Sequence, residues 1–89
     1  MSKVSASPTK SLALLVEIKS LINDEPCASA EVIETDLGWI VEFKTKAGVK
    51  VLASTRNPYH PKLYNSPNAA LNTIKSLGLA ETKVFFLKS

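Results

Sequence analysis

Residues 39–55 read WIVEFKTKAGVKVLAST, which is two alternating runs on either side of a short turn. Every second residue is apolar: Trp39, Val41 and Phe43 in the first run, and Val49, Val51 and Ala53 in the second. A period of two is typical of half-buried strands. A short link that ends in Gly48 therefore predicts a β-hairpin.

Turn length determines which residues of the two strands face each other. A three-residue link over 46–48, with its glycine in the left-handed region, pairs Phe43 with Val51 and Val41 with Ala53. A similar link over 36–38 pairs residue 33 with 41 and residue 35 with 39. We predict an antiparallel meander of three strands over 31–35, 39–45 and 49–55.

Helix signals lie on both sides of the meander. Ser7-Pro8 begins an apolar stripe that predicts a helix over 8–23, and Ser66-Pro67 and Gly78 bound a second helix over 67–77. Residues 62–64 could form a short edge strand, and 82–87 (TKVFFL) a final strand. We predict one α+β domain over 8–89, in the order α-β-β-β-α-β, after a flexible tail over 1–7.

The composition fits one small domain. The chain has 89 residues, 45% of them hydrophobic, a net charge of +3 and a pI of about 9.1, so acidic partners are mildly favoured. Cys27 has no second cysteine with which to form a disulfide. Ser2 to Lys10 lacks the apolar core of a secretory signal, and the longest apolar run near the start, Leu12 to Val16, is too short for a membrane span. We expect a cytoplasmic protein without a membrane partner.

No pattern in the sequence predicts catalysis. His60 is the single histidine, and Cys27 has no companion in a metal-binding spacing. Strand alternation places Glu31 and Glu34 on opposite faces, which argues against paired carboxylates. The glycines occur singly, so no phosphate-binding loop is evident. The prediction is a non-enzymatic protein with no catalytic residue, metal, cofactor or small-molecule substrate.

Basic and aromatic residues predict contact with nucleic acid or a nucleoprotein complex. Lysine and arginine neutralise phosphates, and an exposed tyrosine stacks on an unpaired base. The candidates occupy the hairpin tip and the proline-containing stretch 55–64: Lys44, Lys46, Lys50, Arg56, Tyr59, Lys62 and Tyr64.

The alternative is a protein-interaction module, for instance a phage- or plasmid-encoded modulator of a host complex. Val32, Ile40 and Leu52 form an apolar row on the second face of the predicted meander. This row would bind a protein partner or a second copy if both helices cover the Trp39 face, and it would be core if the helices cover opposite faces. The 56–64 loop is a second candidate surface.

The C-terminal half resembles small plasmid-borne partition-associated proteins. The shared succession is strand, turn, strand, Arg56, the run 63–66 (LYNS), an Ala69-Ala70 helix, the run 77–79 (LGL) and a strand at Val84. This resemblance implies a non-enzymatic accessory role near plasmid DNA or its partition complex. The chain differs from the family by inserting residues 57–61.

Two other folds share the element order but lack matching residues. The order is similar to that of double-stranded RNA-binding domains, whose last helix begins with lysines, whereas here the helix begins Ser66-Pro67-Asn68. The meander and helix also look like AP2 DNA-reading domains, but the arginine-rich strands of that family are absent.

Overall fold

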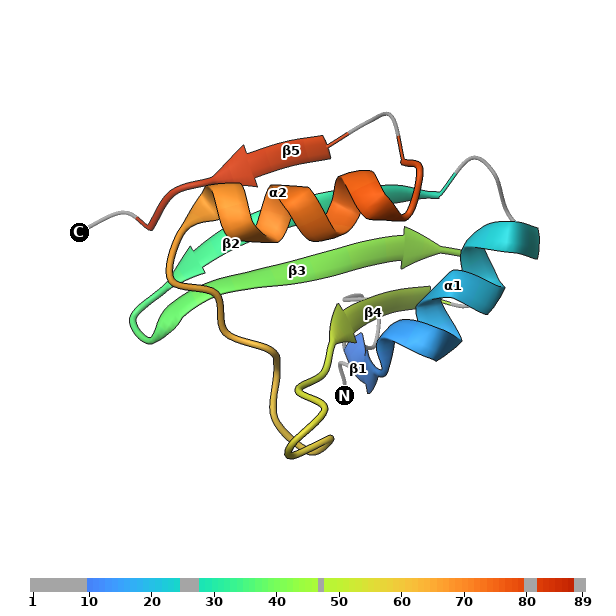
Figure 1. The fold of residues 1–89 in the computed structure, drawn as a ribbon, viewed down its shortest axis with the longest axis horizontal. Coiled ribbons are helices and arrows are strands. Elements are labelled where there is room, and N and C mark those ends of the chain that lie inside the picture. The colour runs from blue at the N-terminus through green and yellow to red at the C-terminus, as the bar shows by residue number, and fades with distance from the viewer. Residues whose placement is uncertain (1–9, 25–27, 47, 80–81, 88–89) are drawn as a thin grey trace, which may run out of the picture.

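The fold is a five-stranded sheet with two helices, as the computed structural model in Figure 1 shows. The structure describes residues 10–24, 28–46, 48–79 and 82–87. The elements in chain order are β1 (Lys10–Ala13), α1 (Leu15–Asp24), β2 (Ser29–Thr35), β3 (Gly38–Thr45), β4 (Gly48–Leu52), α2 (Pro67–Ser76) and β5 (Thr82–Phe85). The α+β class and the order helix, three strands, helix, strand are confirmed, with one further strand before the first helix.

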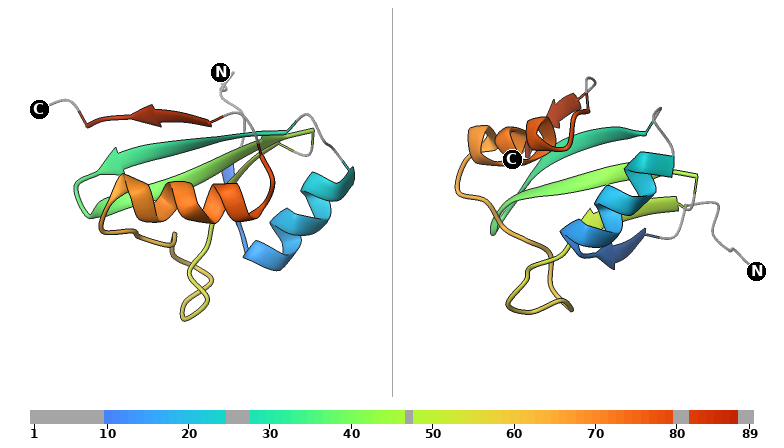
Figure 2. Two further views of the ribbon diagram at one scale, coloured as in Figure 1. Left: turned by 45° about the horizontal axis from the view of Figure 1, so that its top comes forward. Right: turned by 45° about the vertical axis from the view of Figure 1, so that its right-hand side comes forward.

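The sheet is mixed, and both helices cover the same face of it (Figures 1 and 2). The strand order is β1-β4-β3-β2-β5. The central strands β2, β3 and β4 are antiparallel, whereas β1 runs parallel to β4 and β5 parallel to β2. Helix α1 packs over β3 and β4, and α2 packs over β2, β3 and β5. The core lies between the sheet and these helices.

The meander has the three predicted strands, but β4 ends at Leu52 instead of residue 55, and the register differs. Val41 pairs with Val32, and Phe43 pairs with Lys50, so both hairpins are shifted by one residue from the predicted pairing. The cause is turn length: each link has two residues, 36–37 and 46–47, and the glycine after it pairs within the strand.

A threonine closes each of these two turns. The Thr35 hydroxyl donates to the Gly38 carbonyl at 2.7 Å, and the Thr45 hydroxyl donates to the Gly48 carbonyl at 2.9 Å. Both links therefore follow the same Thr-x-x-Gly pattern. A shift of one residue moves every side chain of β2 and β4 to the other face relative to β3.

The first helix begins later than predicted. Residues 10–13, expected as helix, form β1 and pair with residues 49–52 of β4. Helix α1 then starts at Leu15, and the Glu17 carboxylate accepts a hydrogen bond from the Leu14 amide at 3.0 Å, which caps the first turn. The predicted Ser7-Pro8 cap lies outside the described residues. Backbone pairing with the free edge of β4 is thus favoured over helix formation in residues 10–13.

The second helix matches its prediction closely. The Ser66 hydroxyl accepts a hydrogen bond from the Ala69 amide at 3.3 Å, and Pro67 occupies the first turn. Gly78 ends the helix with φ +81°, a conformation that favours glycine. Ala70 and Ile74 face the core and are buried completely or nearly so.

In the part of the chain that the structure describes, ten buried residues form the main core cluster. The sheet contributes Ala13, Ala30, Val32, Trp39, Val41, Phe43 and Leu52, and the helices contribute Ile18, Ala70 and Ile74. Both helices therefore cover the Trp39 face of the sheet, which is the first of the two arrangements that the sequence left open. Neither helix in the described part of the chain is long and apolar enough to cross a membrane.

Candidate nucleic-acid interface

The chain between β4 and α2 first leaves the sheet and then returns into it. The Lys62 amide donates to the Leu52 carbonyl of β4 at 2.8 Å. Two residues later, Tyr64 exchanges hydrogen bonds of 2.8 and 2.9 Å with Trp39 of β3. Residues 61–64 thus sit between the diverging ends of β3 and β4, rather than at an edge as predicted.

This return closes a loop at residues 53–61, which we call the 53–61 loop. Ala53 bridges Pro61, and the Ser54 amide donates to the His60 carbonyl at 2.9 Å. Ala53 also donates to the Ala13 carbonyl at 2.9 Å, which fixes the base of the loop to β1. Backbone hydrogen bonds therefore hold both ends of the loop.

The tip of the loop is a tight turn. The His60 amide donates to the Asn57 carbonyl at 3.0 Å, and the Tyr59 amide donates to the Asn57 side chain at 3.2 Å. Asparagine favours this arrangement because its side chain can accept a hydrogen bond from the backbone two residues on. Pro58 restricts the backbone further. The tip is consequently ordered without a regular element.

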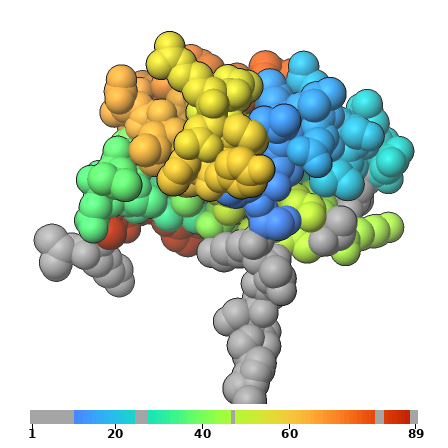
Figure 3. Space-filling model, turned by 90° about the horizontal axis from the view of Figure 1, so that it is seen from below, coloured from blue at the N-terminus to red at the C-terminus, as the bar shows by residue number. Residues whose placement is uncertain are grey.

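The loop projects away from the sheet and exposes its side chains. All residues from Thr55 to His60 are exposed, and Tyr59 retains 85% of its accessible surface. Figure 3 looks toward this side of the molecule and shows the loop, in yellow, between the orange start of α2 and the blue β1–α1 segment. Arg56, Tyr59 and His60 thus face solvent within one short turn.

Lys62 and Tyr64 lie next to the base of the loop. The Lys62 Nζ is 5.6 Å from the centre of the Tyr64 ring, which is within cation–π range. Tyr64 is half-buried, and its hydroxyl shares a 2.8 Å hydrogen bond with Thr73 of α2. Tyr64 therefore attaches the loop to the helix, whereas the exposed Lys62 extends the basic surface of the loop.

The other predicted basic residues lie elsewhere. Lys44 forms a 3.0 Å ion pair with Glu31 on the sheet face that the helices leave uncovered, and Lys46 is at the β3–β4 turn. Lys50 is half-buried and donates to the Ser11 hydroxyl at 3.0 Å. The turn and the loop are at opposite ends of β4, about 15 Å apart. The seven predicted residues therefore do not form one patch.

The predicted apolar row is wrong. Val32 and Leu52 are 0% and 3% exposed and belong to the core under the helices, whereas Ile40 is half-buried on the opposite face. The register shift explains this, because Val32 pairs with Val41 and shares its face. Val32, Ile40 and Leu52 cannot act together as an interface.

Charge is segregated along the chain, a signal that the sequence-based prediction of the site did not use. Between Glu42 and Glu81 the chain has no aspartate or glutamate, although it has Lys44, Lys46, Lys50, Arg56, Lys62 and Lys75. The 53–61 loop lies in the middle of this acid-free stretch. His60, interpreted above only as a histidine without catalytic partners, joins Arg56 and Tyr59 at the tip.

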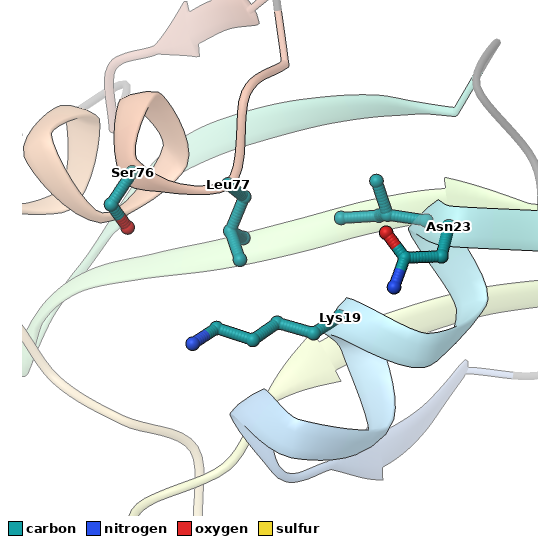
Figure 4. Close-up of a pocket in the computed structure, with 5 residues that line it drawn as sticks. Lys19, Asn23, Ser76 and Leu77 are labelled. Atoms are coloured by element: carbon teal, nitrogen blue, oxygen red, sulfur yellow. The ribbon is translucent and has the colours of Figure 1, made fainter.

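Two cavities in the described part of the chain lie away from the 53–61 loop. One, of about 200 Å³, lies between α1 and α2 and is lined by Lys19, Ile22, Asn23, Ser76 and Leu77 (Figure 4). It is smaller than a typical ligand pocket of about 300–1,000 Å³. Another, of about 370 Å³, is lined by Leu12, Ala13, Glu17, Ser20, Leu21 and Lys50. Neither of these two includes His60.

Metal ligands do not gather in the described part of the chain either. No group of three or more histidine, cysteine, aspartate or glutamate side chains there could hold a metal ion. Cys27 lies outside the described residues. The 53–61 loop and Lys62 bring exposed basic and aromatic side chains together on one surface.

Comparison with known proteins gives no match. No family model fits the sequence, and no characterised protein or solved structure is significantly similar to it.

Proposed function

We propose that this protein is a non-enzymatic nucleic-acid-binding module that uses the 53–61 loop and Lys62 as its contact surface. The proposal rests on the loop tip, which backbone hydrogen bonds hold in place. The tip exposes Arg56, Tyr59 and His60 in a stretch of sequence without acidic residues. Within this stretch no carboxylate offsets the positive charge that the tip presents to a polyanion.

Each residue has a separate role in the proposed contact. Arg56 and Lys62 neutralise phosphates, and Tyr59, with 85% of its surface exposed, stacks on a base. Because the Ser54–His60 and Asn57–His60 hydrogen bonds fix the backbone, ordering the loop on binding costs little entropy. In the cell, this binding would serve the accessory role at a plasmid partition complex that the sequence resemblance implies.

Salt-dependent binding tests the proposal. The measurement is the fluorescence anisotropy of a short labelled DNA duplex and of one of its strands, at low and at physiological salt. We expect Arg56→Ala with Lys62→Ala to weaken binding and to reduce the salt dependence, by about 0.9 in the log–log slope for each duplex phosphate that is no longer neutralised. Tyr59→Ala should weaken binding to the single strand by about 1–3 kcal/mol.

The matched control removes the same charge at the other end of β4. Lys44→Ala with Lys46→Ala also lowers the net charge by two, but these residues lie at the β3–β4 turn. We expect this variant to bind almost as well as the unmodified protein. Equal weakening by both pairs of substitutions, or no binding of either oligonucleotide at low salt, would contradict the proposed interface.

A further inference from the structure

Strand β5 forms one edge of the sheet and carries exposed apolar side chains. It pairs with β2 on one side, and within the described chain no strand pairs with its outer side. Phe85, Phe86 and Leu87 are 46%, 69% and 49% exposed, and Leu37 in the β2–β3 turn is 81% exposed. An apolar edge strand presents unpaired main-chain groups to another strand.

The residues after β5 are held in place beside this edge. The Leu87 amide donates to the Glu34 carboxylate at 2.9 Å, and the Phe86 ring meets Trp39 edge-on with centroids 5.5 Å apart. These contacts keep the end of the strand alongside β2. The edge strand therefore runs from Thr82 to Phe85, two residues shorter than the predicted strand over 82–87, and the two residues after it are held against β2 and β3.

We infer that β5 pairs with the β5 strand of a second copy, antiparallel, to form one continuous sheet across two molecules. The charge pattern of the strand favours this occupant. A two-fold axis at Val84 places the one charged residue of the strand, Lys83, opposite Phe85 of the other copy. Like charges do not face each other, and lysine packs well against an aromatic ring.

A second copy supplies both the main-chain hydrogen-bond partners and the apolar cover that the edge lacks. It presents an identical row of main-chain donors and acceptors, and it brings the same apolar residues to cover Phe85 and its neighbours. Pairing of identical surfaces closes after two molecules, whereas pairing of β5 with the β1 edge of another copy would continue into an open fibre.

The dimer is independent of the proposed nucleic-acid contact. The loop leaves the sheet between β3 and β4, which lie on the other side of β2 from the β5 edge (Figure 1). Each dimer would therefore carry two accessible loops. A protein that remains monomeric and still binds DNA with salt dependence would refute this inference and leave the proposed function intact.

Sedimentation over a range of protein concentrations tests the inference. We expect the unmodified chain to form dimers, and Phe85→Lys to weaken self-association by roughly tenfold or more, because it adds a charge to the paired edge. The matched control is Val16→Lys, the same kind of change at a 69% exposed position of α1, which should leave the dimer unchanged. A monomer at all concentrations, or open-ended assembly, would overturn the inference.

Amide hydrogen exchange of the unmodified protein provides a second test that needs no variant. Exchange in β5 should slow as the protein concentration rises, while exchange in the 53–61 loop should not change. A dimer in which β5 exchanges at the same rate as in the monomer would place the interface elsewhere and contradict the inference.

Discussion

Gly38 ends the β2–β3 turn and packs closely against residues 63–64, where the chain returns to the sheet. Its φ is +144°, and a Cβ atom there would lie 3.0 Å from the Tyr64 carbonyl oxygen and 3.6 Å from the Leu63 Cβ. The Gly38 carbonyl accepts the hydrogen bond from the Thr35 hydroxyl. A side chain at this position would therefore strain the turn and push residues 63–64 away from β3.

Gly78 offers a comparison because it also has positive φ but has open space around it. A Cβ there would meet nothing within 4 Å. We expect Gly78→Ala to lower the free energy of unfolding by about 1 kcal/mol, from the backbone alone. Gly38→Ala should lower it by about 2 kcal/mol or more, because steric conflict with a backbone carbonyl is added. Chemical denaturation measures both, and equal decreases would contradict the packing described for Gly38.

At the level of elements, the loop is attached to α2 through Tyr64 and Thr73. Their hydroxyl groups lie 2.8 Å apart, and the Tyr64 ring packs on the core. This hydrogen bond and the Trp39–Tyr64 bridge tie β3, the returning chain and α2 together. The helix therefore helps to position Lys62 at the base of the loop.

A double-mutant cycle tests this attachment. Tyr64→Phe and Thr73→Val should each lower the free energy of unfolding by about 1 kcal/mol, because each leaves one hydroxyl without its partner. The double variant should be destabilised by much less than the sum, since the two changes remove the same hydrogen bond. Additive effects in urea denaturation would show that the two groups do not interact.

At the level of the whole molecule, the features discussed above occupy separate places. The 53–61 loop, the lysines of the β3–β4 turn and the β5 edge arise from different parts of the sheet. The helices hold the core and leave all three accessible. Substitutions at the three places should therefore alter folding, the proposed nucleic-acid contact and the proposed self-association one at a time.

Shortening the loop tests the separation of folding from binding. Ser54 and His60 already form a hydrogen-bonded pair, so an Asn-Gly turn can replace Thr55–Tyr59 between them. We expect the thermal midpoint to change by less than about 5 °C, because the removed residues are exposed. Binding to both oligonucleotides should disappear. Retained binding in a folded variant would show that the loop does not touch the nucleic acid.

Part of the candidate site could be predicted because its residues are neighbours along the chain. Arg56, Tyr59 and Lys62 lie within seven positions, in the loop or directly after it, so their proximity follows from the sequence. Lys44, Lys46 and Lys50 also appear close, but strand alternation and the β3–β4 register distribute them over different surfaces. Nearness in sequence is a reliable guide only within a single turn or loop.

Local signals defined most elements of this protein. Alternation over 39–43, the Ser66-Pro67 helix start and the Gly78 stop each act within a few residues, and each appears where expected. The register, β1 and the face of Val32 and Leu52 depended on the assembled sheet. Alternation leaves the register between two strands open by one residue, and closure of the turns by Thr35 and Thr45 selected the observed pairing.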